Sequence, residues 1–169
     1  MTATVPSVSE MLRERATLWR KGNSYEEFTP GRVFAHHWGR TITESDNTIF
    51  TTLTLNYNPL YFNAEYARSE GHAGVQVCPM LVFNTIFGLS VQDLSEAGGL
   101  FLGIEDLNYH APVYPGDTLT ASSEVLSCRN SKSDERHGIV SWHTRGFNQK
   151  RAIVLEFKRT NMVRKEKYR

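Results

Sequence analysis

The segment from Pro79 to Ser90 (Pro-Met-Leu-Val-Phe-Asn-Thr-Ile-Phe-Gly-Leu-Ser) is apolar on nearly every side when it is drawn as a helix. Proline suits the first position of a helix, because its missing N–H would have no partner inside the helix. A helix that is apolar all round is normally buried, and this one is too short to cross a bilayer, which takes about 20 residues. We therefore expect a buried helix at the centre of a domain.

The chain after residue 100 has the character of a sheet. Apolar residues alternate with their neighbours, as Ile153, Leu155 and Phe157 do, and Pro-Gly, Asn and Asp mark the turns. A group of antiparallel strands that follows helices is typical of the α+β class. The expected strands are Leu100–His110, Thr118–Cys128, Gly138–Phe147 and Ala152–Val163.

The first 75 residues predict short helices and one strand. Ser7 and Glu10 form a capping box for a helix over residues 8–21. A second helix is expected to start at Thr43 and to end near Asn56. A strand at Val33–Trp38 and a helix at Ala64–Glu70, capped by Asn63, complete this part. We divide the chain into an N-terminal helical extension (1–24) and one domain (25–169).

Composition excludes several classes of protein. The chain has 169 residues and a net charge of +1, which argues against charge-driven binding to nucleic acid or to an anionic membrane. Two distant cysteines form no disulfide framework, and no apolar leader precedes the domain. The six histidines have no spacing typical of a metal site. We expect a cytoplasmic protein without a metal.

Three motifs together resemble one known family. They are Gly39–Asp46, Asn58-Pro59-Leu60, and the string A-P-V-x-x-G-D-T-L from Ala111 to Leu119. The chain is similar to the MaoC-like (R)-specific enoyl-CoA hydratases, and the resemblance implies a hotdog fold, an antiparallel sheet wrapped around a central helix. Two further segments, His143–Gln149 and Arg159–Val163, resemble the branch that hydrates mesaconyl-CoA and itaconyl-CoA.

The resemblance also points to an altered active site. The family pattern is Asp-x-Asn-Pro-Leu-His, in which the carboxylate activates water and the histidine handles the second proton. Here Asn56 replaces the aspartate and Tyr61 replaces the histidine. An amide orients a water without deprotonating it. A phenol, with a reference pKa of about 10, acts as a proton donor at neutral pH.

The oxyanion donor is altered as well. The family starts its central helix with His-Gly-Met, whereas this chain has Cys78-Pro79-Met80. Because Pro79 has no N–H, the donor must come from Met80 or from the Asn84 side chain. We expect Asn56, Tyr61 and His110 as catalytic residues, and Asn58, Pro59, Met80 and Asn84 as substrate-binding residues.

Each of these residues also has a purely structural interpretation. Asn56 suits a helix C-cap, Tyr61 suits a half-buried packing position, and Asn58-Pro59 is common in turns. His110, at the end of a predicted strand, either faces the cleft or lies on the surface. Five other titratable residues are interpreted mainly as structural: His36, His37, Glu44, Asp46 and Asp117.

Three functions remain open. The first is a lyase that hydrates a short, branched or dicarboxylic enoyl-CoA, or dehydrates the corresponding 3-hydroxyacyl-CoA. The second is a hotdog thioesterase, and the third is a non-catalytic acyl-CoA-binding subunit that pairs with a catalytic hotdog chain. In each case the resemblance implies a coenzyme A thioester as substrate carrier, no further cofactor, and a homodimer or a heteromeric assembly.

Overall fold

The computed structural model describes residues 7–9, 16 and 21–169. The helix predicted at 8–21 therefore lies largely outside the described residues. The domain boundary at residue 24 stays a prediction.

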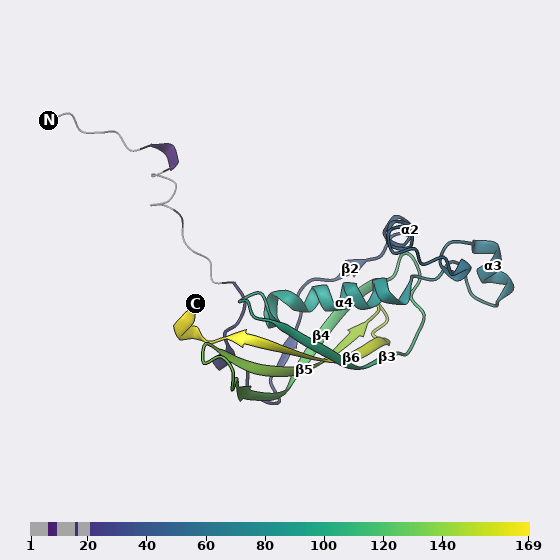
Figure 1. The fold of residues 1–169 in the computed structure, drawn as a ribbon. Helices are drawn as coiled ribbons and strands as arrows, with labels where there is room; N and C mark the ends of the chain where they lie inside the picture. Colours follow the sequence, from purple (N-terminus) through teal and green to yellow (C-terminus); the bar gives the residue numbers. More distant parts are fainter. Residues whose placement is uncertain (1–6, 10–15, 17–20) are drawn as a thin grey trace.

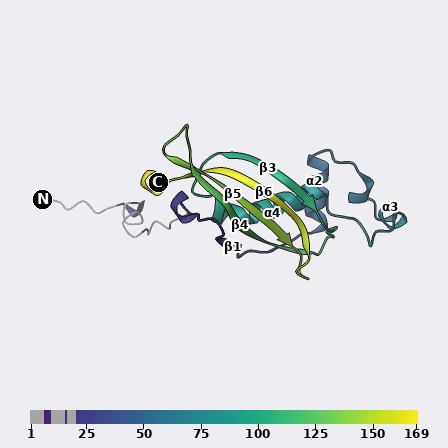
Figure 2. The same ribbon diagram turned by 90° about the horizontal axis from the view of Figure 1, so that it is seen from below.

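An antiparallel sheet makes up most of the domain (Figures 1 and 2). Its order is β1-β4-β5-β6-β3, and β2 pairs with β4 beside this path. The four strands expected after residue 100 are confirmed, each to within three residues at either end. The strands are β1 (Val33–Ala35), β2 (Arg40–Thr41), β3 (Phe101–Tyr109), β4 (Thr118–Asn130), β5 (His137–Phe147) and β6 (Ile153–Arg164).

The strand expected at Val33–Trp38 ends early, at Ala35. His36 still donates its backbone N–H to Ala121 at 3.0 Å. Beyond it the chain leaves the sheet, and the Trp38 side chain is 66% exposed. The His37 ring lies against the Trp38 ring at a tilt of 50°, with the ring centroids 4.9 Å apart.

Between β2 and β3 the chain forms α2 (Glu44–Leu53), α3 (Ala64–Ser69) and α4 (Pro79–Leu94). Thr43 and Asp46 form the capping box of α2, and each side chain accepts a hydrogen bond from the other residue's backbone N–H. The Asn63 side chain caps α3, as predicted. Short 3₁₀ helices lie at Tyr25–Glu27 (η1), Pro59–Tyr61 (η2) and Glu166–Tyr168 (η3).

Helix α4 lies across the concave face of the sheet (Figure 1). Its buried side chains, Val82, Ile86, Ser90 and Leu94, recur every four residues and form one stripe along the helix. Gly146 of β5 permits this contact, because a Cβ there would lie 2.7 Å from the Ile86 side chain. Each fully buried Val, Ile or Leu contributes about 1.5–3 kcal/mol.

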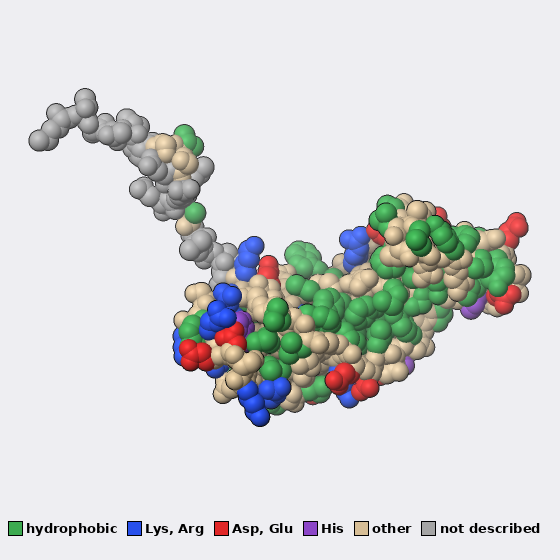
Figure 3. Space-filling view, in the orientation of Figure 1, with side chains coloured by type: hydrophobic (Ala, Val, Ile, Leu, Met, Phe, Trp, Pro, Cys, Tyr) green, Lys and Arg blue, Asp and Glu red, His purple; other side chains and the backbone are tan. Residues whose placement is uncertain are grey.

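Helix α4 is the central helix of the fold, as expected, but in the single chain only one side of it is fully buried. The helix runs four residues beyond Ser90, and its outer face stays open. Met80 is 48% exposed, and Phe83 and Phe87 are half-buried. Figure 3 shows hydrophobic side chains over the region of α4 and up onto α2. Helix α4 is apolar on nearly every side because its outer face is a second apolar surface, which the single chain leaves uncovered.

A buried polar cluster lies under the C-terminal half of α4. His36 contacts Asp93 through Nδ1 (2.6 Å) and Ser123 through Nε2 (2.9 Å), so it is a satisfied core histidine, as expected. Nearby, the Arg159 guanidinium donates to Ser90 and Ser95. Burial lowers the pKa of Arg159 to about 10.

Across the described part of the chain, no helix has both the length and the apolar composition needed to span a bilayer.

Candidate active site

The start of α4 is held by Asn47, a buried residue of α2. Its Oδ1 accepts the backbone N–H of Cys78 at 2.8 Å, and its Nδ2 donates to the carbonyls of Tyr61 (2.9 Å) and Gln76 (3.0 Å). The Asn47 side-chain amide thus connects α2 to the turn at Tyr61 and to the segment that carries Gln76 and Cys78. The sequence motifs did not identify Asn47. The signal that could have identified it is a polar residue on the inward-facing side of a predicted helix.

Hydrogen bonding at the start of α4 determines which backbone N–H is available to a ligand. The Cys78 N–H is taken by Asn47, Pro79 has none, and the Leu81 N–H donates to the Cys78 carbonyl at 2.9 Å. In the part of the chain that the structure describes, the Met80 N–H has no acceptor. It points from the positive end of a 16-residue helix, which supports the expectation that Met80 supplies the oxyanion donor.

Asn56, which follows the end of α2, also lies close to the start of α4. The helix ends at Leu53 and Thr54 is its C-cap, so Asn56 is not the cap residue. Its Nδ2 lies 3.3 Å from the Cys78 Sγ, and Cys78 is fully buried. The Asn56 amide therefore lies beside the first turn of α4.

Cys78 affects the pKa of two phenols, Tyr61 and Tyr109. Burial raises the pKa of Tyr61, and Cys78 raises it further. Burial also raises the pKa of Tyr109, followed by Cys78 and Tyr61, so the three side chains lie within electrostatic reach of one another. The Tyr109 hydroxyl donates to the Pro79 carbonyl at 3.0 Å. Both phenols are neutral near pH 7 and can donate a proton.

Tyr109 was missed by the sequence reasoning. The signal was present, because Tyr109 directly precedes His110 at the end of a predicted strand. Successive strand residues point to opposite faces, so one of the two was bound to face the helix. Only the folded sheet shows that Tyr109 is the one bonded to α4.

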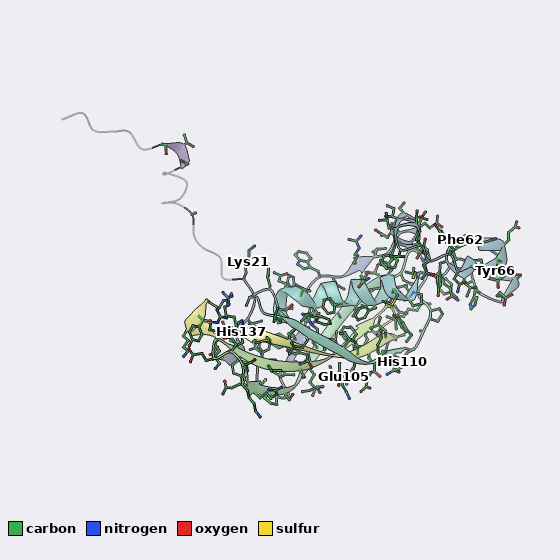
Figure 4. The ribbon with its side chains drawn as sticks, viewed as in Figure 1. Lys21, Phe62, Tyr66, Glu105, His110 and His137 are labelled. Atoms are coloured by element: carbon green, nitrogen blue, oxygen red, sulfur yellow. The ribbon has the colours of Figure 1, made fainter. Side chains whose placement is uncertain are left out.

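His110 has a different environment from Asn56 and Tyr61. Its Nε2 lies 3.1 Å from Glu156, which also contacts the His143 Nε2 at 2.9 Å. Burial raises the pKa of Glu156, but the hydrogen bonds from the two histidines outweigh it and leave the pKa lowered. Figure 4 places His110 at the end of the sheet below the start of α4. A catalytic role for His110 stays a prediction.

The four expected substrate-binding residues lie in two separate pairs. Asn58 caps η2 by accepting from the Leu60 N–H at 3.1 Å, and Pro59 is the first residue of that helix, so both build the turn that presents Tyr61. Met80 and Asn84 lie one turn apart on the exposed side of α4. Their binding roles stay predictions.

Two pockets meet at Met80 and Asn84. One, of about 540 Å³, also contacts Asn56 and Tyr57. The other, of about 660 Å³, is an apolar groove between α4 and β3. Besides Met80 and Asn84, its lining residues are Phe83, Phe87, Phe101, Ile104 and Leu107. Among the residues that the structure describes, no carboxylate or imidazole lines either pocket. Within the described ranges, no group of three or more His, Cys, Asp or Glu residues is arranged to hold a metal ion.

A sequence model of one family, described as mesaconyl-CoA hydratase, matches residues 3–168. The chain belongs to the mesaconyl-CoA hydratase family. A mesaconyl-CoA hydratase of Haloarcula marismortui is 35% identical over 155 residues, which cover 91% of this chain and 43% of that protein. The branch suggested by His143–Gln149 and Arg159–Val163 is thereby confirmed.

Solved structures confirm the hotdog fold. A MaoC domain protein dehydratase from Chloroflexus aurantiacus superimposes with a TM-score of 0.81 at 37% identity, covering 86% of this chain and 41% of that one. A Mycobacterium tuberculosis protein with a double hotdog fold gives 0.76 at 23% identity, covering 86% and 45%. The chain thus spans less than half the length of each of these three proteins.

Proposed function

We propose that this chain is one hotdog unit of a lyase that reversibly hydrates a short, branched dicarboxylic enoyl-CoA of the mesaconyl-CoA type. The observation that carries the proposal is that Asn56 and Tyr109 contact the residues at the start of α4, beside the Met80 N–H. Tyr61 lies within electrostatic reach of Cys78 and lines a different pocket, which also contains Glu44. Membership in the mesaconyl-CoA hydratase family supports the substrate class.

In the proposed reaction, the thioester oxygen accepts the Met80 N–H, and the positive end of α4 stabilises the negative charge that develops there. The Asn56 amide orients a water toward the β-carbon. The water oxygen bonds to the β-carbon while a base takes one of the two water protons, and the other proton stays in the new hydroxyl group. Tyr61, with Tyr109 next to it, donates a proton to the α-carbon, and the base then returns its proton to the Tyr61 phenolate. The Asn56 pocket does not supply this base.

We place that base on a second hotdog unit. The outer face of α4 and the edge strand β3 are open, with Phe101 54% exposed and Leu102 48% exposed. Within the described part of the chain, β3 pairs with β6 alone, so its other edge can pair with a strand. A second copy of this chain or a related chain would cover the 660 Å³ groove.

A second candidate function is a non-catalytic acyl-CoA-binding unit. The specific observation in its favour is that Asn56 and Tyr61 stand at the positions of the family's base and acid, with no carboxylate in the pocket that Asn56 lines. In that case the partner unit carries the whole reaction. This unit would then contribute the fold and part of the substrate tunnel.

One assay separates these functions. The purified chain is incubated with mesaconyl-, itaconyl- and crotonyl-CoA while the absorbance of the conjugated enoyl thioester and the release of free thiol are followed. Loss of conjugation without thiol supports the lyase, and thiol release supports a thioesterase instead. Binding without reaction supports the non-catalytic unit. Light scattering of the same sample gives the assembly state, and a monomer that hydrates mesaconyl-CoA would contradict the need for a partner.

A further inference from the structure

A separate pocket of about 350 Å³ lies on the other side of the α4 start, next to Pro79 and Val82. Its lining is mainly apolar, like that of most small-molecule sites, with a few polar groups that fix orientation. The polar side chains are His72, Gln76, Tyr109 and His110. No carboxylate lines this pocket, which distinguishes it from the pocket that contains Glu44.

His72 and Gln76 form a fixed pair of donors. The Gln76 side-chain amide lies 2.7 Å from the His72 Nδ1, and an amide NH₂ can only donate. The ring hydrogen of neutral His72 is therefore on Nε2, which has no partner among the described residues. The Gln76 backbone is bonded to Leu60 and Asn47, so the loop that carries these donors is anchored on both sides.

We propose that this pocket binds the free carboxylate of a dicarboxylic acyl thioester, with His72 and Gln76 as the donors. The inference rests on the proposed function, which places the thioester oxygen at the Met80 N–H. Pro79, the residue before Met80, lines the pocket, and the Tyr109 hydroxyl, which also lines it, donates to the Pro79 carbonyl. His110 is another lining residue, and its Nε2 lies 3.1 Å from Glu156.

The other cavities around α4 are less suited to a carboxylate. The apolar groove offers only Asn84. The pocket lined by Arg40 does contain a cation, but Arg40 is already paired with Asp46 at 2.9 Å. A free carboxylate there would compete with an existing one. The pocket of His72 and Gln76 offers donors without that competition.

Succinyl-CoA and butyryl-CoA test this inference without any turnover. Both are saturated and so cannot be hydrated, and they differ by one terminal carboxylate in place of a methyl group. Calorimetry with the full chain is expected to show at least tenfold tighter binding of succinyl-CoA, or about 1.4 kcal/mol. His72→Phe and Gln76→Met should each reduce that preference severalfold. Arg40→Gln is the matched control and should keep it.

The outcomes separate the two proposals. Equal binding of the two thioesters by the unmodified chain, or an unchanged preference in both variants, would overturn the inference. A clear preference for succinyl-CoA in a chain that does not hydrate mesaconyl-CoA would overturn the lyase and leave the carboxylate pocket standing. If neither thioester binds, both proposals fall. Circular dichroism of each variant confirms that a lost preference is not lost folding.

Discussion

The Asn47 Oδ1 accepts the Cys78 backbone N–H at 2.8 Å, and this bond ties α2 to the first residue before α4. It engages one backbone N–H at the helix start, whereas the Met80 N–H has no acceptor among the described residues. The Nδ2 of the same side chain donates to the backbone carbonyl of Tyr61. One buried side chain therefore fixes the backbone at Tyr61 and at the start of α4.

Asn47→Asp should be more damaging to activity than to folding. The carboxylate keeps the acceptor for Cys78 but loses the two donors to Tyr61 and Gln76, and each buried acceptor left unpaired costs about 1–3 kcal/mol. We expect a loss of stability together with a drop in kcat for mesaconyl-CoA. Thermal unfolding and steady-state kinetics measure the two effects. Thr48→Ala, the neighbouring position, serves as control, and equal behaviour of the two variants would contradict the positioning role.

Tyr61→Phe should lower kcat by about 10²-fold or more, the usual scale for one acid–base group. Tyr109→Phe should have a smaller effect, because its hydroxyl already donates to the Pro79 carbonyl. Tyr66→Phe, on α3, controls for loss of a phenol that is 40% exposed and away from Cys78. An unchanged rate in Tyr61→Phe would remove this residue from the mechanism.

Arg159→Met should destabilise the fold. The guanidinium is 1% exposed and donates to Ser90, Ser95 and Asn161, and the variant leaves these groups without their donor in the core. We expect roughly 1–3 kcal/mol for each acceptor that finds no new partner. Denaturant unfolding measures the change. Lys158→Met alters the adjacent exposed cation and should have little effect; a similar loss there would argue against burial as the cause.

Stability should fall as pH drops below about 6.5, with His36 as one source. Burial lowers the pKa of His36, and the hydrogen bond that its Nδ1 makes to the Asp93 carboxylate opposes that shift without cancelling it. Below its reference pKa the unfolded chain binds the proton more readily than the folded one, so protonation favours unfolding. The limit for one proton is about 1.4 kcal/mol per pH unit.

His36→Gln should flatten this part of the stability profile, and His37→Gln, a change to an exposed ring, should leave it unaltered. Unfolding free energies between pH 5 and 8 test the difference. Parallel profiles for the unmodified chain and His36→Gln would rule out His36 as the titrating group.

Local chemistry in the sequence was enough to predict most of the fold. The alternating apolar residues of β6, the Thr43 and Asn63 caps, and Pro79 at the start of α4 each depend on neighbours in the chain. The family resemblance around Asn58 and Pro59 gave Asn56 and Tyr61 as expected site residues. These features are short-range, so a single sequence carries them.

Long-range contacts decided the rest. Asn47, Gln76 and Tyr109 come from a helix, a loop and a strand, and only the folded chain brings their polar groups to one helix start. The face of β3 that meets α4 depends on register, which places Tyr109 against Pro79 and leaves His110 with Glu156. Hydropathy alone did not predict the open side of α4 either, because an exposed apolar surface has the same composition as a buried one.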